Sequence, residues 1–229
     1  MPYNWLLLDA DGTLFDYDKA ESKALRTSLV RIGIRFRPEY HATYRTINAA
    51  LWKAFERNEI TQTEVRTKRF EQLFDEIGVQ ADATAFDSLY LEALSREADL
   101  IDGARSVLAQ LAKHAKMVLL TNGIPHVQRS RLARSELAPY FQAIIISGEI
   151  GVAKPDPRIY EATFDAIRNP RKATVLMVGD SLTSDIQGGN NAGIDTCWYN
   201  PTRHPSPRDP TPTYEIASLD ELVPLVASQ

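Results

Sequence analysis

The stretch from Trp5 to Thr13 constrains the fold of this chain most, because a short apolar run there ends in two acids. The run Trp5–Leu8 carries no charge, and it predicts a strand buried on both faces, as in a parallel sheet. Asp9 and Asp11 follow at once, with Gly12-Thr13 after them. In open α/β folds, ligands bind at the carboxyl ends of the strands. Taken alone, Asp-x-Asp-Gly-Thr is equally typical of a polar turn.

A long helical stretch follows before a second strand is expected. Apolar residues recur at spacings of three and four between Tyr40 and Phe55, and Thr61-x-x-Glu64 predicts a capping box at the start of another helix. A crossover between parallel strands needs only about a dozen residues. Residues 17–100 are therefore predicted to form an inserted α-helical domain, and residues 1–16 and 101–229 are predicted to form an α/β core.

Beyond residue 101, apolar runs alternate with helical patterns, which predicts a parallel sheet with right-handed crossovers. Strands are expected near residues 116–120, 143–146, 174–178, 196–199 and 214–216. Two of these strands end in polar residues, Thr121-Asn122-Gly123 and Gly179-Asp180, and Asp185 follows five positions after Asp180. Lys154 follows the strand that ends near residue 146. The carboxyl ends of parallel strands share one edge, so these side chains should gather beside the first two acids.

The acids of these motifs would repel one another in one cleft unless a cation or a proton compensates. They are Asp9, Asp11, Asp180 and Asp185, and the only cation expected from the protein is Lys154. A hard cation is the natural complement, and carboxylates combined with water and phosphate suit Mg²⁺ better than Ca²⁺. The motifs contain no His or Cys, so a zinc centre is not expected there.

The same side chains suit the transfer of a phosphoryl group. Asp9 can act as a nucleophile, because aspartyl phosphates are established covalent intermediates. Asp11 can protonate a leaving oxygen and then deprotonate a water. The metal, Lys154, the hydroxyl of Thr121 and backbone amides would hold the oxygens of the phosphoryl group.

Composition excludes other classes of function. The 26 basic and 30 acidic residues give a net charge of −4, which provides no basic surface for nucleic acid. No apolar run approaches the ~20 residues that cross a bilayer, and the first residues do not resemble a signal peptide. The single cysteine, Cys197, has no partner for an internal disulfide. A cytoplasmic location is therefore expected.

Together the motifs resemble those of the haloacid dehalogenase (HAD) superfamily of phosphohydrolases. They are Asp9-x-Asp11-Gly12-Thr13, Thr121-Asn122-Gly123, Lys154-Pro155 and Gly179-Asp180-x-x-x-x-Asp185. The resemblance implies a Rossmann-like doubly wound parallel sheet with a helical cap inserted after the first motif. It also implies a magnesium site at Asp9, Asp11 (through its carbonyl), Asp180 and Asp185, and phosphoryl contacts from Thr121, Asn122 and Lys154.

A narrower resemblance covers nearly the whole chain. Tyr44-x-x-Ile47-Asn48-x-x-Leu51-Trp52, the segment 148–157 and Cys197-Trp198-Tyr199-Asn200 are similar to the YjjG-type pyrimidine 5′-nucleotidases. That group hydrolyses nucleoside 5′-monophosphates and prefers pyrimidine and deoxy substrates. The resemblance therefore implies a nucleoside monophosphate as the small-molecule partner.

Two alternatives stay open at this point. A phosphatase of sugar phosphates or phosphoglycolate shares every catalytic residue and differs only in the cap, and function resides in sites rather than in folds. A non-catalytic binding module could also use this scaffold. A dehalogenase is disfavoured because it should lack the acid/base carboxylate that Asp11 supplies. The oligomeric state is left open.

Overall fold

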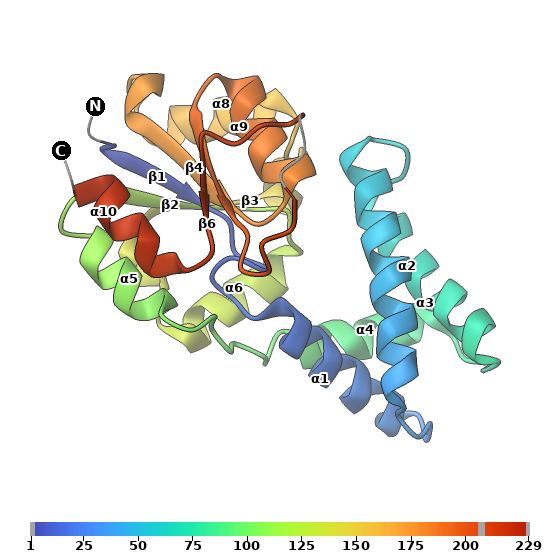
Figure 1. Ribbon diagram of the computed structural model, residues 1–229. Coiled ribbons are helices and arrows are strands. Elements are labelled where there is room, and N and C mark those ends of the chain that lie inside the picture. Colours follow the sequence, from blue (N-terminus) through green and yellow to red (C-terminus); the bar gives the residue numbers. More distant parts are fainter. Residues whose placement is uncertain (1–2, 206–208, 228–229) are drawn as a thin grey trace. The chain divides into compact units, whose positions relative to one another are not determined.

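Six parallel strands form one sheet within the residues that the computed structural model describes, 3–205 and 209–227, in the order β3-β2-β1-β4-β5-β6 (Figure 1). The strands are β1 (Trp5–Leu8), β2 (Lys116–Thr121), β3 (Phe141–Ile146), β4 (Val175–Gly179), β5 (Asp195–Tyr199) and β6 (Tyr214–Ile216). β1 pairs with both β2 and β4, so Leu7 lies between Val118 and Met177. The strand that precedes the two acids is therefore inside the sheet, with a neighbour on each side.

Helices cover both faces of this sheet, which confirms the predicted α/β fold. One face is covered by α5 (Ala104–Leu111), α6 (Pro125–Ser135) and α10 (Leu222–Ala227), and the other by α8 (Pro157–Ala166) and α9 (Gln187–Ala192). Shorter turns are η1 (Ala138–Tyr140), α7 (Ser147–Ile150), η2 (Lys172–Thr174), η3 (Leu182–Ile186) and η4 (Leu219–Glu221). The π-helical turn η3 follows β4 and continues directly into α9.

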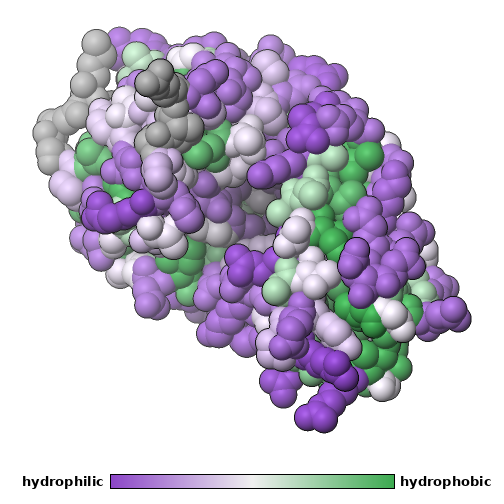
Figure 2. Space-filling model, turned by 45° about the vertical axis from the view of Figure 1, so that its right-hand side comes forward, coloured by the Kyte–Doolittle hydropathy of each residue, from purple (hydrophilic) through white to green (hydrophobic). Residues whose placement is uncertain are grey.

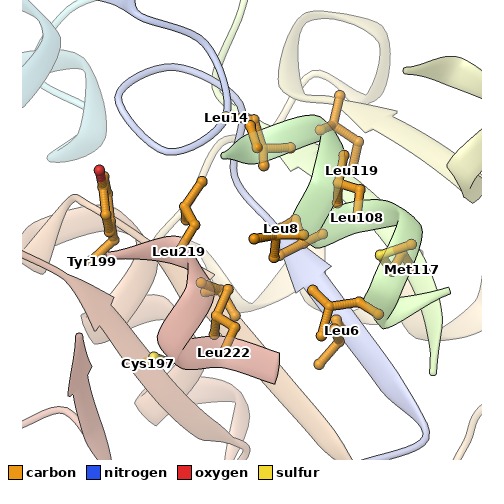
Figure 3. Packing of buried hydrophobic residues seen from close by; sticks show 14 of the residues in the cluster. Leu6, Leu8, Leu14, Leu108, Met117, Leu119, Cys197, Tyr199, Leu219 and Leu222 are labelled. Atoms are coloured by element: carbon orange, nitrogen blue, oxygen red, sulfur yellow. The ribbon is translucent and has the colours of Figure 1, made fainter. Parts of the chain in front are cut away.

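Successive residues of β1 point to opposite faces of the sheet. Leu6 and Leu8 pack into the cluster under α5 and α10, where Figure 3 shows them beside Leu108 and Leu222. Leu7 packs into the cluster on the other face, under α8. All three leucines are at most 1% exposed. The strand is buried on both faces, as its uninterrupted apolar sequence predicts.

The chain divides into two compact units, residues 1–17 with 98–229 and residues 18–97. The segments that lead out of and back into the first unit lie side by side. Phe15 forms an antiparallel bridge with Leu100, and the amide of Ile101 donates to the carbonyl of Leu14 at 2.9 Å. The inserted residues therefore leave and re-enter the first unit at neighbouring positions.

The second unit is made of α1 (Tyr17–Arg31), α2 (Pro38–Glu56), α3 (Gln62–Ile77) and α4 (Ala83–Leu94). The predicted capping box is present at the start of α3, where Thr61 and Glu64 bond reciprocally. Aromatic rings fill the interior, and the buried guanidinium of Arg69 lies 4.8 Å from the ring centroid of Phe70. Arg69 is neutralised by Asp87 at 2.7 Å. A buried charge is tolerated only when it is paired in this way.

Hydrophilic residues cover most of the face shown in Figure 2, and apolar residues gather on its right-hand part. Among the described residues, none of the helices has both the length and the apolar character needed to cross a bilayer.

We expect Leu7→Ala to destabilise the protein by about 2–5 kcal/mol, because it leaves a cavity in the middle of the sheet. Val30 in α1 is 59% exposed, so Val30→Ala should change stability by less than about 0.5 kcal/mol. Urea unfolding of the two variants beside the parent chain measures both effects. Equal losses in the two variants would contradict the central position of β1.

Candidate active site

Lys154 is a buried lysine at the carboxyl edge of the sheet, and all three of its ammonium protons have acceptors. Its Nζ donates to Asp9 Oδ1 at 2.6 Å, to Asp185 Oδ1 at 2.6 Å and to the carbonyl of Leu120 at 2.7 Å. Its side chain is only 1% exposed. These bonds join the ends of β1 and β2 to the turn η3 that follows β4. The predicted approach of Lys154 to this edge is therefore present in the structure.

The loop that carries Lys154 is fixed by Asn122. The side-chain amide of Asn122 donates to the carbonyl of Lys154 at 2.8 Å, and its Oδ1 accepts from the amide of Lys154 at 2.8 Å. Asn122 follows β2, so this reciprocal pair attaches the lysine loop to the sheet edge. In this arrangement the Asn122 side chain positions Lys154, and Thr121 lies buried beside it.

Three carboxylates converge around the lysine. Oxygen atoms of Asp9, Asp180 and Asp185 all lie within 4.8 Å of one another. Asp9 and Asp185 are buried, whereas Asp180 is open to solvent. The group thus holds up to three negative charges against one ammonium, and its members come from positions as far apart as 9 and 185 in the sequence.

The surplus of negative charge shifts the pKa values of these groups. Burial raises the pKa of Asp9 from 3.8 to about 7, Lys154 opposes the rise, and Asp185 adds to it. Burial lowers the pKa of Lys154, but Asp185 and Asp9 outweigh burial and raise it, so the amine stays protonated. Burial and repulsion from Asp9 and Asp185 raise the pKa of Asp180, although its exposure to water limits the effect of burial. The group therefore favours an additional cation or proton.

The turn after β1 brings Thr13 and Gly12 into the same group. The hydroxyl of Thr13 is 3.3 Å from Asp9 Oδ2 and accepts from the amide of Asp180 at 3.1 Å. Gly12 has a φ of +85°, and a Cβ atom there would overlap the carboxylate of Asp180. Only glycine allows the turn to approach Asp180 this closely.

Asp11 lies apart from the three carboxylates and is bound to α6 instead. Gln128 Nε2 donates to Asp11 Oδ2 at 2.6 Å, and Arg131 Nη1 forms an ion pair with Asp11 Oδ1. Gln128 also reaches the hydroxyl of Thr121 at 3.3 Å. Arg131 is fully buried, with its guanidinium carbon 4.4 Å from the ring centroid of Phe15. The expectation that Lys154 is the only cation of the site is wrong, because Arg131 is a second one.

Neither Gln128 nor Arg131 belongs to a motif that predicts a site. The stretch 125–135 is rich in polar and basic residues, a composition typical of an exposed helix. Gln128, Arg131 and Ser135 nevertheless share one helical face and are all buried. The available signal was their spacing of three and four, which placed a polar stripe where an apolar one is usual.

The three-carboxylate group fits a hard divalent cation. Its ligands are carboxylate oxygens, and no His or Cys belongs to it among the described residues. This donor set suits Mg²⁺ and does not suit a zinc centre. Such a cation would offset the charge that Lys154 leaves uncompensated.

Comparison with known proteins agrees with this geometry. Residues 3–193 match the family described as "Hydrolase: haloacid dehalogenase-like hydrolase". The pyrimidine 5′-nucleotidase PynA of Streptococcus pneumoniae is 40% identical over 97% of this chain and 94% of its own length. The pyrimidine 5′-nucleotidase YjjG of Escherichia coli is 34% identical over 99% of both chains. A crystal structure of the HAD-hydrolase YfnB of Bacillus subtilis, bound to magnesium, superposes with a TM-score of 0.94 at 38% identity and covers 99% of each chain.

This chain belongs to the haloacid dehalogenase-like hydrolases. The family match extends from β1 past η3, so it includes every group described above. The resemblance drawn from the four sequence motifs is therefore confirmed at the level of the family.

The proton affinity of Asp9 gives a testable dependence of stability on pH. Between about pH 4 and pH 7 the folded, metal-free protein holds a proton on Asp9 that the unfolded chain has released, so stability falls as pH rises through this window. Asp9→Asn removes this loss. We expect the variant to be more stable than the parent at pH 8, and to gain less at pH 5.

Thermal unfolding in the presence of a chelator measures this difference. Asp75 is exposed in α3, and Asp75→Asn serves as the matched control with the same shift at both pH values. Added Mg²⁺ should narrow the advantage of Asp9→Asn at pH 8, because the ion stabilises the parent carboxylate. If Asp9→Asn gains the same stability over the parent at both pH values, the pKa of Asp9 is not raised in the folded protein, which would contradict the prediction.

Proposed function

We propose that the protein is a magnesium-dependent phosphomonoesterase that hydrolyses nucleoside 5′-monophosphates through an aspartyl-phosphate intermediate. The observation that carries the proposal is the group of Asp9, Asp180 and Asp185 around Lys154. Asp11 is bound separately, by side chains of α6. This arrangement offers a nucleophile, a proton carrier and a place for a cation at one edge of the sheet. The similarity to two pyrimidine 5′-nucleotidases supports the class of substrate.

Asp9 is the nucleophile in this proposal. Its Oδ1 accepts a short bond from Lys154 at 2.6 Å, whereas its Oδ2 has the longer contact with Thr13 at 3.3 Å. Oδ2 is therefore the oxygen that attacks phosphorus. The bond from phosphorus to the alcohol oxygen of the substrate breaks, and the phosphoryl group passes to Asp9.

Asp11 is the proton carrier. It gives a proton to the departing alcohol oxygen in the first step and takes a proton from the attacking water in the second. The water then displaces Asp9 from phosphorus, which releases inorganic phosphate and restores the carboxylate. Both oxygens of Asp11 accept bonds from α6, so each proton transfer requires Asp11 to exchange one of those partners for the reacting oxygen.

We propose that Mg²⁺ binds at Asp9, Asp180 and Asp185 together with the carbonyl of Asp11. When bound, the ion supplies positive charge beside the phosphoryl oxygens. Lys154 supplies a second fixed charge, and Thr121 contributes its hydroxyl. Asn122 contributes by holding the lysine loop.

We propose that residues 17–100 act as a cap that selects the substrate, with the α/β core formed by residues 1–16 and 101–229. Every group assigned to the chemistry lies in the first unit, so the second unit is left to recognise the nucleoside. The same chemistry would serve a phosphatase of sugar phosphates. Substrate preference therefore requires a separate test from mechanism.

Replacing Asp9 or Asp11 should block different steps in the hydrolysis of p-nitrophenyl phosphate, whose leaving group needs no proton. Asp9→Asn should show neither a burst nor turnover. Asp11→Asn should release about one equivalent of p-nitrophenolate per enzyme and then turn over about 10²–10⁴-fold more slowly than the parent. Rapid-mixing absorbance measures both phases. Near-normal turnover by Asp9→Asn would exclude the covalent route.

Substrate preference is measured by kcat/KM with Mg²⁺ for dUMP, dTMP and UMP against AMP, GMP and a set of sugar phosphates. We expect the pyrimidine nucleotides to exceed the purine nucleotides and the sugar phosphates by about tenfold or more, a ratio that pocket contacts can provide. A large margin in favour of sugar phosphates would overturn the nucleotidase assignment and leave the phosphatase mechanism standing. Absence of turnover on the whole set would favour a binding module.

A further inference from the structure

A second group of potential metal ligands lies inside the helical unit, between α1 and α2. Ligand atoms of Asp18, Glu21 and His41 lie within 4.8 Å of one another. Glu21 is 3% exposed and is therefore a buried acid. Its Oε1 is 3.2 Å from His41 Nε2, and its Oε2 accepts from Asn48 Nδ2 at 3.0 Å. Asp18 and Glu21 are three residues apart on α1, so they share a face of that helix.

Asn48 gives an independent sign of a ligand at this position. The residue is 4% exposed, and its Oδ1 has no hydrogen-bond partner among the described residues. The donor half of the same amide faces the carboxylate of Glu21, which fixes which atom is the oxygen. A buried acceptor without a donor is unfavourable in a folded protein. This oxygen belongs to the same amide group that contacts Glu21, so it lies close to the ligand group.

We propose that Asp18, Glu21, His41 and Asn48 bind a Zn²⁺ ion within the helical unit. One imidazole nitrogen with oxygen ligands suits a first-row divalent metal and is a poor set for Mg²⁺. The four side chains provide the number of ligands that a closed zinc site uses. The two carboxylates match the charge of the ion, and His41 offers Nε2 once its proton is on Nδ1.

Arg45 is the cation that competes for this position. Its Nη1 is 3.0 Å from Asp18 Oδ1, but both side chains are 59% exposed. Exposed ion pairs of this kind are weak, so Zn²⁺ can displace the guanidinium. With the ion bound, α1 and α2 would be joined by a metal in addition to their side-chain packing.

The test uses the chain of 229 residues in millimolar Mg²⁺, with Zn²⁺ as the probe. X-ray absorption of bound zinc detects imidazole, and the carboxylate group of the candidate active site contains no His. We expect the parent chain to show zinc with an imidazole ligand. His41→Ala should lose this signal and bind Zn²⁺ at least about 100-fold more weakly, since even partners outside the ligand set change metal affinity by about 10–100-fold. His114 is exposed in the turn after α5, and His114→Ala is the matched control that should leave the imidazole signal and the zinc affinity unchanged.

A second variant separates metal binding from folding. Asn48→Asp adds a carboxylate beside Glu21, so it should lower the unfolding temperature without zinc and raise the affinity for Zn²⁺. A purely structural Asn48 would give the first effect without the second. Equal zinc uptake by the parent and His41→Ala, or bound zinc without imidazole in the parent, overturns the proposal.

Discussion

The buried ammonium of Lys154 is the interaction on which the candidate site depends. A lysine can be buried only if its charge is balanced and its protons are bonded, and here three acceptors from three parts of the chain meet that requirement. Asp9 follows β1, Leu120 belongs to β2, and Asp185 lies in the turn after β4. The ends of three neighbouring strands are therefore held to one point. The register of the sheet places these three acceptors together, and their bonds to Lys154 hold the strand ends in that register.

The acids of the site pair with two different cations, Lys154 and Arg131. Lys154 pairs with Asp9 and Asp185 of the three-carboxylate group, and Arg131 pairs with Asp11. The lysine leaves negative charge uncompensated, which favours a divalent cation. Arg131 and Gln128 each donate to one carboxylate oxygen of Asp11. The nucleophile and the proton carrier that we propose, Asp9 and Asp11, can thus lie two residues apart and still have different hydrogen-bond partners.

The sequence was sufficient to predict the parallel sheet and the approach of Asp9, Thr121, Lys154 and Asp180 to one edge. Apolar runs that end in polar residues carry that information, because parallel strands fix where their ends meet. Gln128 and Arg131 could not be found in the same way. They lie inside a polar helix, and their burial depends on α6 packing over the turn after β1, which a periodic pattern does not specify. The ion pair of Arg69 and Asp87 was missed for the same reason, since both residues occur in ordinary amphipathic helices.

The position of the insertion is consistent with the cap that we propose, because the inserted residues leave and re-enter the first unit at neighbouring positions. The turn after β1 closes on itself, with the amides of Leu14 and Phe15 bonded to the carbonyl of Ala10. Residues 98–101 then pair with residues 14–16 before the sheet resumes. The carboxylates and Lys154 are consequently fixed by bonds within the first unit. If the inserted helices form the cap that we propose, changes in them alter which molecule is recognised without moving the groups that we propose act on its phosphate.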